Sequence, residues 1–165
     1  MSAAGTAEHV LTAADDEAVI GIGAPPDDVW ALVSDITTMP RWSPETYRTQ
    51  WVGGVSTAAV GARFRGWNRW GWVRWSTTCE VEVCDPGREF TFATRFGSRA
   101  GTRWSYRFED DGAGGTTVTE ARTQLHAPLH GRIAYATVLR GHNDTFAAAM
   151  AETLGRLKRA AEPPR

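Results

Sequence analysis

Three polar residues, Glu45, Asn68 and Tyr106, stand among aromatic and apolar neighbours, where they could move protons or orient a ligand. A carboxyl group buried in apolar surroundings has a raised pKa, so Glu45 could act as a general acid or base. The amide of Asn68 can hydrogen-bond a ligand carbonyl or hydroxyl group, and the Tyr106 hydroxyl can orient a ligand. This pattern predicts polar chemistry inside a hydrophobic pocket, with Glu45 and Tyr106 as the candidate catalytic residues.

Each of these residues also has an alternative, structural role. Glu45 can stabilise a helix end or form a salt bridge with one of the many arginines, and a structural role of this kind is favoured for it. Asn68 can support the turn before Gly71, as asparagine often does. The hydroxyl group of Tyr106 can find a partner within the fold, as buried tyrosines usually do.

Glu120 lies in a strand that we expect over 116–125, and the register of that strand decides where it points. With a symmetric turn over 109–115, Glu120 pairs opposite Trp104 and faces inward, whereas a shift of one residue turns it outward. An inward Glu120 is expected to pair with an arginine, so a structural role is favoured for it.

Aromatic residues are the strongest signal in the composition. Eight tryptophans occur among 165 residues, and six of them lie between positions 42 and 75. A hollow lined by aromatic rings is where small ligands bind, although a stripe such as Phe146, Met150 and Leu154 can also be plain core. The predicted ligand-binding residues are Trp42, Trp51, Phe64, Asn68, Trp75, Phe92, Trp104, Tyr106, Asn143, Phe146 and Met150.

Several other kinds of site are excluded by the sequence. Gly21-x-Gly23 lacks the third glycine of a dinucleotide loop, and no Gly-x-Ser-x-Gly elbow of a serine hydrolase occurs. The four histidines show no zinc spacing, and Lys158 is the only lysine, which disfavours Schiff-base chemistry. Cys79 and Cys84 are expected on opposite faces of one strand, neither a metal pair nor a disulfide. We therefore expect no metal and no cofactor.

Arginines and tryptophans alternate in one segment and suggest an outer binding surface. They are Arg63, Arg65, Trp67, Arg69, Trp70, Trp72 and Arg74, all expected on the face opposite Phe64 and Trp75. Basic residues among aromatics can stack single-stranded nucleic acid, but the net charge of −1 argues against that partner. Arginine–tryptophan stacking on a solvated face, or a homodimer contact, is the expected role.

The elements that position these residues follow from the hydrophobic periodicity. A short strand over 18–23 precedes a helix that opens at 25–28 and a second, very short helix over 37–42, closed by Pro40. From Tyr47 onward a period of two predicts an antiparallel meander. Its candidate strands are 47–52, 62–69, 72–84, 88–95, 102–109 and 116–125.

The period returns to that of a helix after Pro128. Phe146, Met150, Leu154 and Leu157 form one apolar stripe, and the helix is expected to start near residue 132, on the order of 40 Å long. We expect a disordered leader over 1–16 and a single domain over 17–162. No run of 18 apolar residues and no secretory signal are present, so a soluble, cytoplasmic protein without membrane insertion is expected.

Several segments resemble a known superfamily in the same order along roughly residues 17–161. They are Ala24-Pro-Pro-Asp-Asp-Val-Trp30 with Asp35, Trp42-Ser-Pro-Glu45, Gly61-Ala-Arg-Phe-Arg-Gly66 with Asn68, Trp104-Ser-Tyr-Arg-Phe108, Gly115-Thr-Thr-Val-Thr-Glu120 and Thr153-Leu-Gly-Arg-Leu-Lys158. Together they are similar to the START-like (SRPBCC) superfamily, which includes polyketide cyclase/dehydrase and lipid-transport proteins.

The resemblance implies an α+β, helix-grip (Bet v 1-like) fold. In that fold a curved antiparallel sheet of about seven strands surrounds a long C-terminal helix, with two small helices after the first strand. A deep pocket between sheet and helix would hold a small hydrophobic partner, an aromatic or lipid-like molecule. The alternative function is that of a polyketide cyclase/dehydratase, in which polar pocket residues such as Glu45, Asn68 and Tyr106 handle protons.

Overall fold

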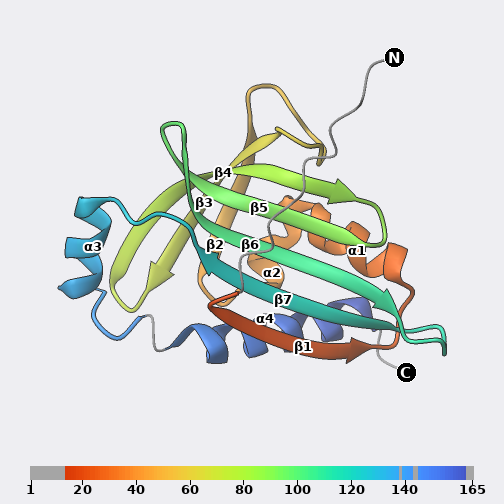
Figure 1. The fold of residues 1–165 in the computed structure, drawn as a ribbon. Coiled ribbons are helices and arrows are strands. Elements are labelled where there is room, and N and C mark those ends of the chain that lie inside the picture. Colours follow the sequence, from red (N-terminus) through yellow and green to blue (C-terminus); the bar gives the residue numbers. More distant parts are fainter. Residues whose placement is uncertain (1–13, 138, 143–144, 163–165) are drawn as a thin grey trace, which may run out of the picture.

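The computed structural model describes residues 14–137, 139–142 and 145–162, which form one seven-stranded antiparallel sheet with helices packed against it (Figure 1). The strand order is β1-β7-β6-β5-β4-β3-β2, so neighbours along the chain are neighbours in the sheet from β2 to β7. The strands are β1 (Asp16–Ile22), β2 (Thr46–Val52), β3 (Arg63–Trp70), β4 (Val73–Asp85), β5 (Glu89–Phe96), β6 (Arg99–Asp110) and β7 (Thr116–Gln124). This confirms the expected α+β, helix-grip architecture.

Three short helical segments connect β1 to β2, the two strands at the edges of the sheet. They are α1 (Pro26–Ser34), the 3₁₀ helix η1 (Ile36–Thr38) and α2 (Met39–Trp42). Proline in the first turn and two acidic residues beside it suit the start of α1. The prediction that Pro40 closes the second helix is wrong. Pro40 lies in the first turn of α2, where its missing N–H costs no helical hydrogen bond.

The described residues after β7 contain two α-helices, α3 (Leu129–Ala136) and α4 (Phe146–Ala161), so the prediction of a single long helix from about residue 132 is wrong. The backbone of Thr137 leaves the helical region and Gly141 has a φ of +83°, a conformation that glycine adopts without strain. The 16 residues of α4 make it about 24 Å long. Its predicted apolar stripe is buried. No described helix is long and apolar enough to cross a membrane.

Helix α4 runs alongside β1 and also contacts α2, while α3 stands at one end of the sheet (Figure 1). The core lies between the sheet and the helices. Strands β3 to β7 supply much of it, and β1, α1, η1, α2 and α4 also contribute buried residues. Its fully buried members include Val29, Val33, Phe64, Val81, Phe90, Val118, Leu154 and Leu157.

The register between β6 and β7 differs from the expectation. Glu120 pairs with Tyr106 rather than with Trp104, which pairs with Arg122. The turn is centred one residue later because the Asp111 side chain accepts hydrogen bonds from backbone N–H groups within it. A shift of two residues preserves the face, so Glu120 still points inward.

A bulge in β4 corrects the predicted placement of the two cysteines. The register with β5 shifts between Val81 and Val83, so two residues of β4 occupy the space of one. Before the bulge the odd-numbered residues of β4 point inward, and after it the even-numbered residues do. Cys84, which pairs with Phe90, therefore packs on the core as Cys79 does. The prediction that they lie on opposite faces is wrong. Both are free thiols.

The outer face of β2 to β4 carries part of the predicted arginine and tryptophan set. The guanidinium groups of Arg48 and Arg65 lie 4.5 Å and 5.4 Å from the centre of the Trp67 ring, and Trp72 is 83% exposed. Trp70 does not belong to this face. Trp70 lies an even number of residues from Phe64 and Asn68 on β3, so its side chain points inward with theirs. Its ring lies 5.3 Å from that of His142.

The first strand begins before the predicted position. Asp16, expected in the leader, is the first residue of β1, and its carboxylate accepts a hydrogen bond from Arg122 at 2.7 Å. Residues 1–13 of the predicted leader lie outside the described residues.

Candidate ligand-binding site

A cavity of about 650 Å³ lies between the sheet, α4 and the segment that leads into α3. Its size falls in the range of sites for small organic molecules. Among the side chains that the structure describes, eight aromatic ones line it: Trp42, Phe64, Trp75, Phe92, Phe96, Trp104, Tyr106 and Phe146. Seven of them are among the predicted residues, and Glu45, Asn68 and Met150 also line the cavity.

Two predicted residues are not placed in the cavity wall. Trp51 packs edge-on against Phe64, with ring centres 5.8 Å apart, and supports the wall from behind. Trp51 on β2 pairs with Phe64 on β3, so its side chain points to the same inward face of the sheet, as predicted. It lies close to the end of β2, beyond the cavity. Asn143 lies outside the described residues.

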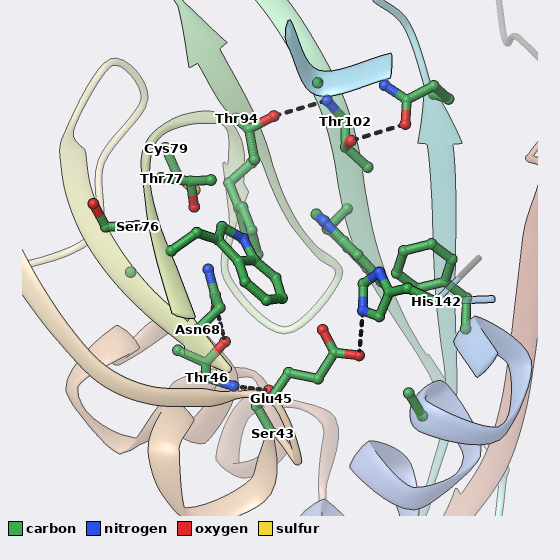
Figure 2. A pocket seen from close by; sticks show the side chains of 18 of the residues that line it. Ser43, Glu45, Thr46, Asn68, Ser76, Thr77, Cys79, Thr94, Thr102 and His142 are labelled. Carbon is green, nitrogen blue, oxygen red and sulfur yellow. Dashed lines mark hydrogen bonds and ion pairs between the residues drawn. The ribbon is translucent and has the colours of Figure 1, made fainter. Parts of the chain in front are cut away.

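Glu45 reaches across the cavity to His142 (Figure 2). Its Oε1 lies 2.9 Å from Nε2 of His142, so the partner is a histidine and not the expected arginine. His142 is 1% exposed, and its ring makes edge-on contacts with Trp70, Trp75 and Phe146. A carboxylate and an imidazole at this distance can share or pass a proton.

Asn68 is oriented by Thr46 from the neighbouring strand. The Thr46 hydroxyl donates a hydrogen bond of 2.8 Å to Oδ1 of Asn68, and the Ser43 hydroxyl accepts the backbone N–H of Thr46 at 3.1 Å. The amide nitrogen of Asn68 points away from Thr46 toward the open cavity (Figure 2). Asn68 is therefore fixed at one oxygen and presents an N–H donor to the interior.

Tyr106 and Glu120 form a second polar pair in the wall. The Tyr106 hydroxyl donates a hydrogen bond of 2.8 Å to Oε1 of Glu120, and the two residues are 3% and 2% exposed. Burial raises the pKa of Glu120 to about 8, although the hydrogen bond from Tyr106 lowers it. Burial and the adjacent carboxyl group also raise the pKa of Tyr106 well above 10. At neutral pH the pair is therefore largely uncharged.

The expected arginine partner of Glu120 is engaged elsewhere. Arg122 is two residues further along β7, and its guanidinium group binds the carboxylate of Asp16. It also lies 4.2 Å from the centre of the Phe146 ring. The partners of Arg122 are therefore Asp16 and Phe146, and its guanidinium group does not pair with Glu120.

Further hydroxyl and amide groups occur where β5, β6 and β7 meet. Thr94 accepts the backbone N–H of Thr102 at 2.8 Å, and the Thr102 hydroxyl donates to Gln124 at 3.2 Å (Figure 2). All three line the cavity. Among the described residues no group of three His, Cys, Asp or Glu could hold a metal ion.

Glu120 and His142 are two of the polar cavity residues that stand outside the predicted ligand-binding set, although the sequence predicts that His142 begins the final helix and could reach the end of the pocket. The sequence places His142 near the start of the final helix, but only the break at Gly141 returns it to the sheet. Glu120 was assigned a structural role because an arginine partner was assumed. Two signals in the sequence indicated that Glu120 points inward. It lies two residues after the apolar Val118, on the same face of its strand, and it falls on the same face of the sheet as Tyr106.

Comparison with known proteins gives a family and several similar folds. A family model described as polyketide cyclase / dehydrase and lipid transport matches residues 14–162. The Polyketide_cyc-like protein Cgl2372 from Corynebacterium glutamicum is 30% identical, with a TM-score of 0.53; the match covers 88% of this chain and 89% of that one. No match was found among the curated proteins.

Two more distant structures show likeness of fold alone. The di-domain ARO/CYC BexL from the BE-7585A biosynthetic pathway is 19% identical, with a TM-score of 0.64; the match covers 90% of this chain and 47% of BexL. The major latex-like protein 151 from Panax ginseng is 12% identical, with a TM-score of 0.63; the match covers 89% of this chain and 96% of that protein.

Proposed function

Since this chain belongs to the polyketide cyclase/dehydrase and lipid transport family, we propose that it binds a small, hydrophobic aromatic molecule between the sheet and α4. The observation that carries this proposal is the cavity of about 650 Å³ with its eight aromatic side chains. Such a volume holds a molecule of two to four fused rings, whose faces and edges can stack on the surrounding aromatic groups.

Aromatic contacts along the wall support a flat ligand. Phe64 and Phe92 meet at a ring distance of 5.1 Å, and Trp42 and Tyr106 meet at 6.0 Å, each pair edge-on. The buried rings hold one another in place, so the cavity is preformed and a ligand loses little free energy to side-chain ordering. Groups such as the amide of Asn68 add orientation to this apolar wall.

Two tryptophans offer a matched test of this proposal. Trp75 lines the cavity, whereas Trp72, three residues earlier, is 83% exposed and does not line it. N-phenyl-1-naphthylamine is an uncharged probe whose fluorescence rises in apolar surroundings. Trp75→Ala should weaken its binding about tenfold, because much of one aromatic contact is lost, and Trp72→Ala should leave binding unchanged.

Native mass spectrometry of the freshly purified protein is the complementary experiment. A defined additional mass of a few hundred daltons, released by denaturing extraction, would identify the ligand directly. If the probe does not bind the wild-type protein, or binds equally well to all three proteins, the cavity is not its binding site and the proposal is wrong.

A second candidate function, polyketide cyclisation or dehydration, is favoured by the pair of Glu45 and His142. Both residues line the cavity, and their side chains lie 2.9 Å apart. In this reaction class a carboxylate or imidazole removes a proton from the carbon next to one ketone, and that carbon attacks the carbonyl carbon of a second ketone. A second group protonates the oxygen of the attacked ketone, which leaves as water, and the remaining ketones enolise to phenols without any reduction. Asn68 and Tyr106 would orient the chain of ketones.

A synthetic linear polyketone tests this second function. Glu45→Gln should change the distribution of cyclised products, measured by liquid chromatography and mass spectrometry, with an unchanged circular dichroism spectrum. Glu109→Gln replaces an exposed carboxylate of β6 and is the matched control. Equal product distributions with wild-type protein, both variants and buffer alone would leave binding as the function.

A further inference from the structure

Glu120 carries a buried carboxyl group, and only one of its two oxygens has a hydrogen-bond partner among the described residues. Its Oε1 accepts the hydrogen bond from Tyr106, whereas Oε2 has no hydrogen-bond partner among the described residues. Polar atoms buried in folded proteins are nearly always paired, because an unpaired one loses its hydration without compensation. Since Glu120 lines the cavity, a molecule inside the cavity can supply the missing partner.

The groups around Glu120 do not neutralise it. From β6 it faces Tyr106, and on β7 the nearest cation, Arg122, is bound to Asp16 of β1. Helix α4 presents only uncharged groups to the cavity, namely Phe146, Ala149, Met150 and Thr153. The other titratable or charged residues of the wall are Cys79 of β4 and, from connecting segments and α3, Glu45, His126, His130, Arg132 and His142.

The protonation state of Glu120 determines what it can offer. With a pKa raised to about 8 by burial, the carboxyl group carries a proton at neutral pH. Tyr106 donates to Oε1, so the proton is available on Oε2. A protonated carboxyl group of this kind is a hydrogen-bond donor in an apolar wall.

Building on the proposed function, we propose that Glu120 donates a hydrogen bond through Oε2 to a ketone or quinone oxygen of the bound aromatic molecule, with Tyr106 holding the carboxyl group. Oε2 is covered by neighbouring atoms, so in the proposed complex a small rotation about the last side-chain bond, whose torsion is soft in glutamate, turns Oε2 toward the ligand while Oε1 stays within reach of the Tyr106 hydroxyl. The preferred ligand is therefore an uncharged aromatic ketone or quinone. A ligand carboxylate would meet Glu120 without a free cation beside it.

Two probes of nearly identical shape test this assignment. 2-Acetonaphthone carries a ketone oxygen, and 2-isopropenylnaphthalene carries a methylene group in its place. The measured quantity is the ratio of ketone to hydrocarbon affinity, determined by equilibrium dialysis. In the wild-type protein this ratio should fall about tenfold between about pH 6.5 and about pH 9.5, as the Oε2 proton is lost.

Substitutions of Glu120 distinguish the loss of its hydrogen-bond donor from the loss of its titrating proton. Glu120→Met removes the donor and should lower the ratio about tenfold at about pH 6.5. Glu120→Gln keeps an N–H donor without a titrating proton, so the ratio should stay high and become independent of pH. Glu109→Gln, an exposed carboxylate on β6, should follow the wild-type protein. Circular dichroism checks that each protein is folded at each pH.

The outcomes distinguish this inference from the function on which it rests. If neither probe binds, the proposed binding function itself fails. If both bind but their ratio is the same at each pH and in Glu120→Met, the cavity binds aromatic molecules and the role of Glu120 is wrong.

Discussion

Nε2 of His142 lies 2.9 Å from Oε1 of Glu45, although 97 positions separate them in the chain. Glu45 precedes β2, and His142 lies in the connection between α3 and α4. This contact therefore joins the connection to the edge of the sheet. The aromatic rings of Trp70, Trp75 and Phe146 enclose the imidazole and hold it in position.

Replacement of His142 by phenylalanine should loosen this connection without emptying the space that the imidazole fills. His142→Phe retains the aromatic packing and removes the bond to Glu45, which should cost about 1 kcal/mol of stability. Hydrogen exchange followed by mass spectrometry should show faster exchange in peptides covering 137–145 and 43–46. Glu45→Gln, which retains an acceptor oxygen, should show a smaller effect. Unchanged exchange in these peptides would contradict the role of the contact.

Ionisation of Glu120 should make the protein less stable as the pH rises. The pKa of this group is about 8 when folded and ordinarily 4.5, so between these values the unfolded chain releases a proton that the folded chain keeps. Stability contributed by Glu120 is therefore lost progressively from about pH 4.5 to about pH 8, by on the order of 5 kcal/mol. Above about pH 8 the difference is constant.

Glu120→Gln should remove this dependence. Compared with wild type, the variant should gain little near pH 5 and should unfold at a higher denaturant concentration near pH 9, as measured by urea titration. Glu109→Gln, at an exposed position, corrects for the change in net charge. A stability difference that does not vary with pH would show that Glu120 ionises normally.

The two cysteines should differ in reactivity. Burial raises the pKa of Cys79 to about 12, so fewer than about one in a thousand of its thiols are ionised near pH 8.5. Cys84 is partly exposed, although burial and Asp85 raise its pKa as well. Iodoacetamide followed by peptide mass spectrometry should modify Cys84 first. Faster modification of Cys79 would contradict its burial in the cavity wall.

Two positions of α4 should separate folding from binding. Leu157 lies in the core and Met150 lines the cavity, and both are at most 1% exposed. Leu157→Ala should cost about 3 kcal/mol, measured by urea unfolding, because it leaves a void among packed side chains. Met150→Ala should cost about 2 kcal/mol and also weaken binding of N-phenyl-1-naphthylamine. Equal binding losses in both variants would mean that α4 acts only through stability.

The strands were predictable because their signals are local. Alternation of apolar and polar residues and the turn residues between runs place all seven strands within about three residues of the observed bounds. The bulge between Val81 and Val83 was not predictable, because it changes the pairing without changing the composition of the strand. The inward position of Cys84 depends on this bulge, so it was not predicted either.

Most of the aromatic wall was also predictable, since parity on a strand selects one face. The polar pairs depend on long-range placement. Glu120 meets Tyr106 because the turn is centred one residue later than symmetry predicts, and His142 meets Glu45 because the helix stops before Gly141. Periodicity cannot specify either partner, because the helix pattern and the strand pattern each extend over one element only.

The interruption at Gly141 has an evolutionary consequence. Helix α3 contributes His130, Gly131 and Ala134 to the wall, and its other side carries the exposed Leu129 and Ile133. Helix α4 and the sheet contribute the buried aromatic and polar groups. Because the two helices are separate, mutations in α3 can alter which sizes of molecule are accommodated while chemical recognition by the sheet is inherited unchanged. Descendants of one ancestral chain can therefore diversify in ligand size at little cost to folding.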